Sequence, residues 1–122
     1  MRILLVGDVV GSPGRRVFRE VVKRLRAESA VHAVVVNAEN AAAGNGITLA
    51  LAEELFASGA DVITMGDHVW GQRELETTIG GEKRLVRPVN FPPGTPGQGY
   101  ATVQTALGPV TVVNLLGRVF MN

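Results

Sequence analysis

No cysteine occurs in the 122 residues of this chain, so disulfides and thiolate metal sites are excluded. A reducing compartment suits such a sequence, and we expect a cytoplasmic protein. The apolar N-terminus is interrupted at Asp8, which is too early for a signal peptide, and no other apolar run approaches the length of a membrane span. We therefore expect no membrane partner.

An excess of charge of either sign is also missing. The 12 Lys and Arg residues oppose 11 Asp and Glu residues, for a net charge of +1. The densest basic group, from Arg15 to Arg26, falls on a predicted helix beside an apolar stripe, where a solvated helix face accounts for it. The sequence thus offers no basic block for duplex nucleic acid, and we expect no such partner.

The common phosphate-binding loops are absent as well. Gly7, Gly11 and Gly14 do not have the G-x-G-x-x-G spacing of dinucleotide-binding folds, and no Gly-Lys-Ser/Thr sequence follows to make a P-loop. An aspartyl-phosphate chemistry would use Asp8 as the nucleophile. Phosphatases of the dehalogenase type would need a second acid two residues later, where this chain has Val10. The remaining interpretation of Asp8 is a metal ligand.

Hydrophobic residues make up 46% of the chain, enough for the core of one domain or part of one. Apolar runs of strand length alternate with segments whose apolar residues repeat at three and four, as on one face of a helix. Right-handed connections turn this βαβαβα order into a parallel sheet with helices outside it. The predicted strands are 2–6 and 31–37, both of a buried type, and 61–65; the predicted helices are 13–29, 48–58 and 71–79.

The pattern changes after residue 84. Residues 85–90 form a short strand or extended piece, and the Pro- and Gly-rich stretch 91–99 must be a loop. Residues 100–105 alternate, 106–109 make a turn and 110–116 are apolar, which predicts a β-hairpin. The last of these strands would be a sticky sheet edge if it were left bare. We therefore expect either a homo-oligomer or the front part of a longer protein.

Three carboxylates each follow the apolar core of a predicted strand: Asp8, Glu39 and Asp67. Asn40 is next to the second of them, and His68 is next to the third. The carboxyl ends of parallel strands meet at the edge where such folds bind ligands, so we expect these side chains to converge. Three acids with an imidazole indicate a metal site with a proton donor. The alternative is that each acid only caps the helix or turn that follows it.

Neighbouring side chains at this edge are expected to have different chemical roles. The carboxylate of Glu39 can bridge two ions, and the amide oxygen of Asn40 can complete a coordination shell without adding charge. Asp67 and His68 point in different directions from an extended chain, so one can ligate metal while the other faces a substrate. His32, at a strand entrance without a neighbouring acid, is interpreted as an ordinary structural residue.

Several different short motifs are distributed along nearly the whole chain. They are Gly7-Asp8, Asn37-Ala38-Glu39-Asn40, Gly66-Asp67-His68 with Trp70, Arg87-Pro88 with Asn90-Phe91, Pro93-Gly94-Thr95-Pro96-Gly97, and Leu116-Gly117-Arg118-Val119-Phe120-Met121. In this order they resemble the signatures of the YmdB-like bacterial metallophosphoesterases, within the calcineurin-like phosphoesterase superfamily. The resemblance implies an α/β sandwich, two bound metals, usually iron or manganese, and hydrolysis of phosphodiesters such as 2′,3′-cyclic nucleotides.

The same resemblance implies a role for each candidate residue. Asp8 would hold one metal, Glu39 would bridge both, and Asn40 would lie in or next to the coordination shell. Asp67 would hold the second metal, and His68 would sit by the phosphate as proton donor or charge stabiliser. The family most often has Asn at position 67, so this chain carries an additional negative charge there.

The resemblance also implies a missing part, because the family is about twice as long and its remaining histidine ligands lie in a C-terminal half. We therefore expect residues 1–122 to be the N-terminal half of a single metallophosphoesterase domain, with an incomplete site and little activity on its own. A different function also accounts for the pattern. In that alternative the chain is a non-catalytic, doubly wound module that binds phosphate or magnesium at Asp8, has a regulatory role and holds one metal at most.

Overall fold

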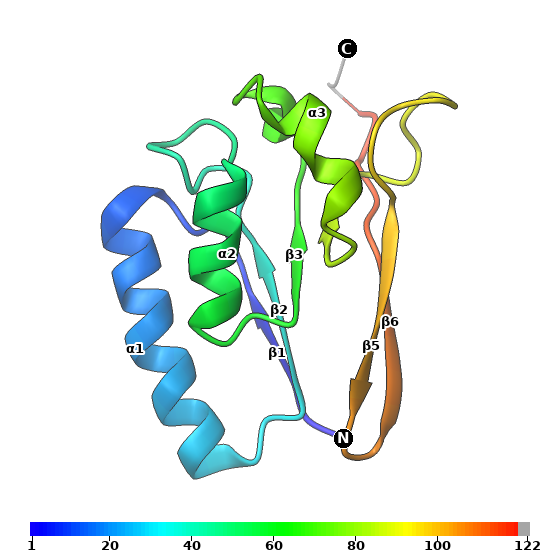
Figure 1. Ribbon diagram of the computed structural model, residues 1–122. Coiled ribbons are helices and arrows are strands. Elements are labelled where there is room, and N and C mark those ends of the chain that lie inside the picture. Colours follow the sequence, from blue (N-terminus) through cyan, green and yellow to red (C-terminus); the bar gives the residue numbers. More distant parts are fainter. Residues whose placement is uncertain (120–122) are drawn as a thin grey trace.

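The computed structural model describes residues 1–119 and consists of a parallel sheet, two helices over one of its faces, and a separate hairpin (Figure 1). The sheet strands pair in sequence order, all in parallel: β1 (Ile3–Val6), β2 (Ala33–Asn37), β3 (Val62–Thr64) and β4 (Leu85–Val86). The first three strands are connected by α1 (Gly11–Ser29) and α2 (Leu49–Ala57). The antiparallel hairpin consists of β5 (Tyr100–Thr105) and β6 (Gly108–Val113). The predicted α/β class, with βαβαβα followed by a hairpin, is confirmed.

Local sequence signals account for the ends of the helices. Thr48 caps α2, since its hydroxyl accepts a hydrogen bond from the Leu51 amide at 3.2 Å. Gly59 follows that helix with φ +113°, a conformation that residues with a Cβ rarely adopt, which explains why the helix predicted over 48–58 goes no further. Helix α1 begins at Gly11, slightly earlier than predicted, and ends at Ser29 before a left-handed Ala30.

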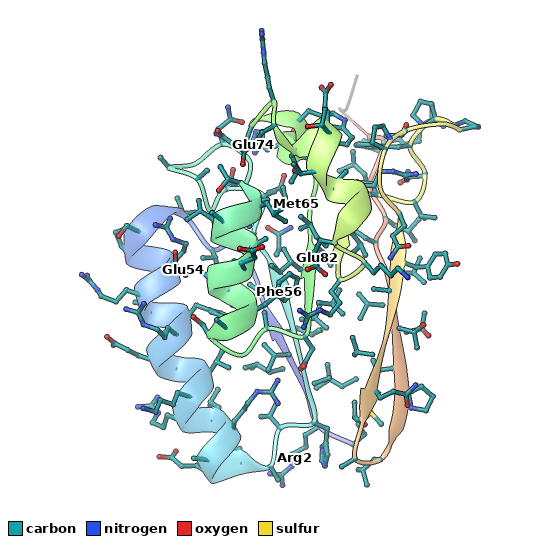
Figure 2. The ribbon with its side chains drawn as sticks, viewed as in Figure 1. Arg2, Glu54, Phe56, Met65, Glu74 and Glu82 are labelled. Atoms are coloured by element: carbon teal, nitrogen blue, oxygen red, sulfur yellow. The ribbon has the colours of Figure 1, made fainter. Side chains whose placement is uncertain are left out.

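The main core lies between the sheet and the two helices. Val34, Val36 and Ile63 from the strands are fully buried there, with Val22 from α1 and Leu55 from α2. Burial of one such aliphatic side chain contributes about 1.5–3 kcal/mol to folding. The core continues to the end of β3, where the buried Met65 precedes Gly66 and Asp67 (Figure 2). This packing holds the strand ends, and hence the candidate residues, in place.

The hairpin covers part of the other face of the sheet. A second cluster joins Val62 of β3 and Val86 of β4 to Ala101 of the hairpin. Asn114 attaches the hairpin to the sheet, because its side-chain amide donates to the main-chain carbonyls of Met65 and Val86. Hairpin and sheet are therefore linked at the same edge as the candidate site.

Several predicted details are wrong. The strand predicted as buried over 2–6 is only half-buried on one face, at Leu4 and Val6, and is exposed on the other, at Ile3 and Leu5. The helix predicted over 71–79 is limited to α3 (Leu75–Thr78), with short 3-10 helices η1 (Asp67–Trp70) before it and η2 (Ile79–Gly81) after it. The hairpin turn is residues 106–107 rather than 106–109, because Gly108 already pairs with Thr105. Strand β6 ends at Val113, earlier than the predicted residue 116, and its Val112 packs against the second cluster.

Among the helices that the structure describes, none has the length and apolar character needed to cross a bilayer. Of the motif residues quoted above, Phe120 and Met121 lie outside the described part of the chain.

Candidate metal site

The three predicted acids follow neighbouring strands at one edge of the sheet. Strands β1, β2 and β3 run in parallel and side by side, so their carboxyl ends lie together at the top of the view in Figure 1. One ligand atom from each of Glu39, Asp67 and His68 lies within 4.8 Å of the others. Two acids and the imidazole predicted from separate strands thus form one cluster of suitable size for a metal ion.

Asn40 connects the fourth predicted residue, Asp8, to this cluster. Its side-chain Nδ2 donates to Asp8 Oδ1 at 2.8 Å, and its Oδ1 lies 2.8 Å from His68 Nδ1. A carboxylate only accepts hydrogen bonds, so Nδ2 must face Asp8 and Oδ1 must face His68. It follows that His68 carries hydrogen on Nδ1, and that its Nε2 is the nitrogen left to meet a ligand or substrate.

The carboxylate of Glu39 is held from several sides. Asn37 Nδ2 donates to Oε1 at 3.2 Å, and the His68 main-chain amide donates to Oε2 at 3.3 Å. His68 Nδ1 is 3.6 Å from the same Oε2. Gly66 leaves the space for this arrangement, because a Cβ at that position would collide with both carboxylate oxygens of Glu39. These contacts fix the position of the Glu39 carboxylate, and the side chain is only 19% exposed.

The loop after β1 aims Asp8 at this edge. Asp8 has φ +44°, in the left-handed region that Asp tolerates better than most residues. Val9 N donates to Asn37 O at 3.0 Å, and Gly11 N donates to Asn40 O at 3.1 Å. These two bonds fasten the loop to the segment that follows β2, which brings the Asp8 carboxylate within reach of Asn40.

Two other motif residues and His32 have structural roles outside the candidate site. The Arg87 guanidinium donates to the carbonyls of Pro88, Thr95 and Pro96, so it holds the proline-rich loop rather than a phosphate. Trp70 packs against the main core, as a packing residue. His32 Nδ1 accepts the Arg2 amide at 2.8 Å, at the opposite end of the sheet, where Arg2 is labelled in Figure 2. The prediction that His32 is structural is confirmed.

Two residues that contribute to the site were not assigned a role from the sequence. Asn37 orients Glu39, and Gly66 provides the space for its carboxylate. Asn37 belongs to a quoted motif, but its partner two residues later was not visible in a linear pattern. The signal for Gly66 was its position between a buried strand and Asp67, where a close approach is a common reason for glycine.

The donor set fits a divalent metal. Carboxylate and amide oxygens with one imidazole nitrogen suit manganese, iron or magnesium, and the Glu39 and Asp67 carboxylates supply the negative charge that balances such an ion. Gly66 has no side chain, which lets the Glu39 carboxylate pack directly against the end of β3. The residues present are thus compatible with the ions that the resemblance implies.

The profile of the YmdB-like protein family matches residues 4–122. The chain belongs to the YmdB-like family. A relative from Bacillus subtilis (strain 168), named 2′,3′-cyclic-nucleotide 2′-phosphodiesterase, is 47% identical over 121 residues, which cover 99% of this chain and 46% of the relative. This chain therefore spans about half the length of the curated relatives that it matches.

Solved structures have the same fold over the shared part. A hypothetical protein from Thermus thermophilus superposes with a TM-score of 0.90 at 34% identity, over 100% of this chain and 47% of the other. A structure described as a novel phosphatase from Mycoplasma pneumoniae superposes with a TM-score of 0.85 at 33% identity, over 95% of this chain and 43% of the other. The fold of this YmdB-like chain thus corresponds to a little under half of each of these longer proteins.

Proposed function

We propose that this protein is the N-terminal half of a metal-dependent phosphodiesterase that acts on phosphodiesters such as 2′,3′-cyclic nucleotides. The observation that carries the proposal is the cluster of Glu39, Asp67 and His68 within 4.8 Å, linked through Asn40 to Asp8. Family membership supports the reaction class, because the relative from Bacillus subtilis is named a cyclic-nucleotide phosphodiesterase.

Four residues are proposed to hold two divalent ions, iron or manganese. Asp8 is assigned to one ion, Asp67 to the other, Glu39 to both, and Asn40 to the edge of the coordination shell. When bound, such ions would supply charge neutralisation at the phosphoryl oxygens and activation of the attacking water. Before any ion binds, Asn37 and the His68 amide already orient the Glu39 carboxylate, so little reorganisation is needed on binding.

His68 is proposed as the proton donor to the leaving oxygen. Its Nδ1 is occupied by Asn40 Oδ1, so the protonated ring presents Nε2–H outward. Its side chain is 45% exposed, which leaves it accessible to a bound substrate. A phosphodiester releases an alkoxide, and a proton delivered to that oxygen lowers the barrier.

A metal count separates this proposal from the non-catalytic alternative. The protein for this experiment is the present chain joined to the part of the Bacillus subtilis relative outside the matched region, called here the extended chain. We expect two manganese or iron ions per extended chain, together with hydrolysis of a 2′,3′-cyclic nucleotide. One ion at most, with no hydrolysis, would favour the regulatory module.

The isolated chain is expected to be a poor enzyme. The described residues contribute only part of the coordination shell that two ions require, and the remaining ligands are proposed to come from the rest of the domain. With manganese, hydrolysis of bis-para-nitrophenyl phosphate should fall far below a typical turnover of about 10 per second. The extended chain assayed in parallel is the control. Typical turnover by the isolated chain would contradict the division of the site between two halves.

Gly66→Ala is expected to weaken metal binding while leaving the fold intact. The new methyl group would push away the end of the flexible Glu39 side chain and not a backbone segment. Changes to groups that orient a ligand typically cost 10- to 100-fold in metal affinity, so we expect about that loss. Calorimetric titration of the extended chain with manganese measures it. Gly80→Ala is the matched control, because a Cβ there meets nothing within 4 Å, and equal affinities in the two variants would refute the role of Gly66.

A further inference from the structure

Strand β1 has a neighbour on one side only within residues 1–119, since the sheet order is β1-β2-β3-β4. Its backbone polar groups alternate between the two sides. The amide and carbonyl of Arg2 both face His32, toward β2. The alternation therefore turns the amides and carbonyls of Ile3 and Leu5 outward, where they are ready to pair with another strand.

The face of the sheet that carries the hairpin becomes more exposed toward this edge. Leu5, Val35 and Val62 lie in one row across β1, β2 and β3 by the strand register. Their exposures are 74%, 8% and 0%. The hairpin packs on Val62 and Val86, so its cover does not extend to β1. An exposed Leu at the end of such a row indicates an apolar surface that continues beyond the edge.

The opposite face is also open beside β1. A hollow of about 380 Å³ lies between this strand and α1, and its lining is mainly apolar, with Val6, Val9, Val17, Phe18, Val21 and Val22. Val17 is 56% exposed, although it belongs to the apolar stripe of the helix. Apolar surface beside the β1 edge is thus uncovered on both faces of the sheet. A further strand placed at this edge would have apolar neighbours on both of its faces, as strands inside parallel sheets do.

We infer that an apolar strand pairs along the outer edge of β1, with alternate side chains in the hollow under α1 and beside Leu5. The strand is assigned to the part of the YmdB-like domain outside the matched region. The relatives supply the length for it, because the matched part covers only 46% of the Bacillus subtilis protein and 47% of the Thermus thermophilus structure. Since β1 leads directly to Asp8, the added strand also brings its own end or loop near the candidate metal site.

The test compares Leu5→Lys in the isolated chain and in the extended chain. Leu5 is exposed in the isolated chain, so the variant should unfold at nearly the same temperature as the parent. In the extended chain the lysine would be buried without a partner, and the unfolding temperature should drop clearly. Val17→Lys should behave in the same way. Leu107→Lys, at the hairpin turn and 58% exposed, is the matched control and should change neither protein.

Hydrogen exchange provides a readout that does not depend on substitution. The Ile3 and Leu5 amides should exchange at least about tenfold more slowly in the extended chain than in the isolated chain, since pairing protects them. Equal exchange in both proteins, or equal tolerance of Leu5→Lys in both, would overturn the inference. A dimer of the isolated chain that Leu5→Lys dissociates in sedimentation would overturn it too, because a second copy would then be the partner of this edge.

Discussion

Glu39→Gln is expected to remove the metal ions and the hydrolytic activity of the extended chain together. The carboxylate of Glu39 accepts hydrogen bonds at both oxygens, from Asn37 and from the His68 amide. A glutamine replaces one of these oxygens by an NH2 group, which cannot accept a hydrogen bond or ligate a cation. It also removes the negative charge that balances the ions. Elemental analysis after gel filtration and a cyclic-nucleotide assay measure the two losses on the same sample.

Glu53→Gln is the matched control for this variant. Glu53 is exposed on α2, away from the strand ends, so the same change should leave metal content and rate unaltered. Retention of both ions by Glu39→Gln would show that Glu39 does not bridge them. Loss of metal without loss of activity would show instead that the reaction does not depend on this site.

His68→Ala is expected to keep the metal ions and lose rate, by about 10²–10⁴-fold, the usual worth of general acid–base assistance. The loss should be smaller for para-nitrophenyl esters, because their leaving group needs little protonation. The structure is also compatible with a second role for His68. One His68 nitrogen lies within 4.8 Å of ligand atoms of Glu39 and Asp67, so the ring is also placed to be a metal ligand.

The two possible roles of His68 predict different metal contents for the His68→Ala variant. If His68→Ala strips an ion, the imidazole is a ligand and the proton must come from another group. His32→Ala is the control for a histidine outside the site. His32 accepts the Arg2 amide at the far end of the sheet, and its loss should change neither metal content nor rate by more than a small factor.

Much of the fold follows from local patterns that the sequence carries by itself. Apolar runs and three–four periodicity located the strands and long helices, Thr48 and Gly59 marked the ends of α2, and the strand order placed the acids at one sheet edge. These features are predictable because each depends on residues close in sequence and on the general geometry of parallel sheets. Short irregular elements such as η1 carry no periodic signal, and for that reason the helix predicted over 71–79 was too long: only α3, at Leu75–Thr78, is α-helical there.

The sequence alone thus determined which residues meet at the edge of the sheet, because strand polarity assigns Asp8, Glu39 and Asp67 to the same side. Only the tertiary structure decided how they meet. The bridge from Asp8 through Asn40 to His68 joins residues 28 and 32 positions apart, and its direction depends on side-chain geometry that no linear spacing encodes. The exposure of Leu5 is likewise a tertiary property. An apolar strand looks the same in sequence whether both its faces are covered or only one, and what covers them is set by packing between distant segments.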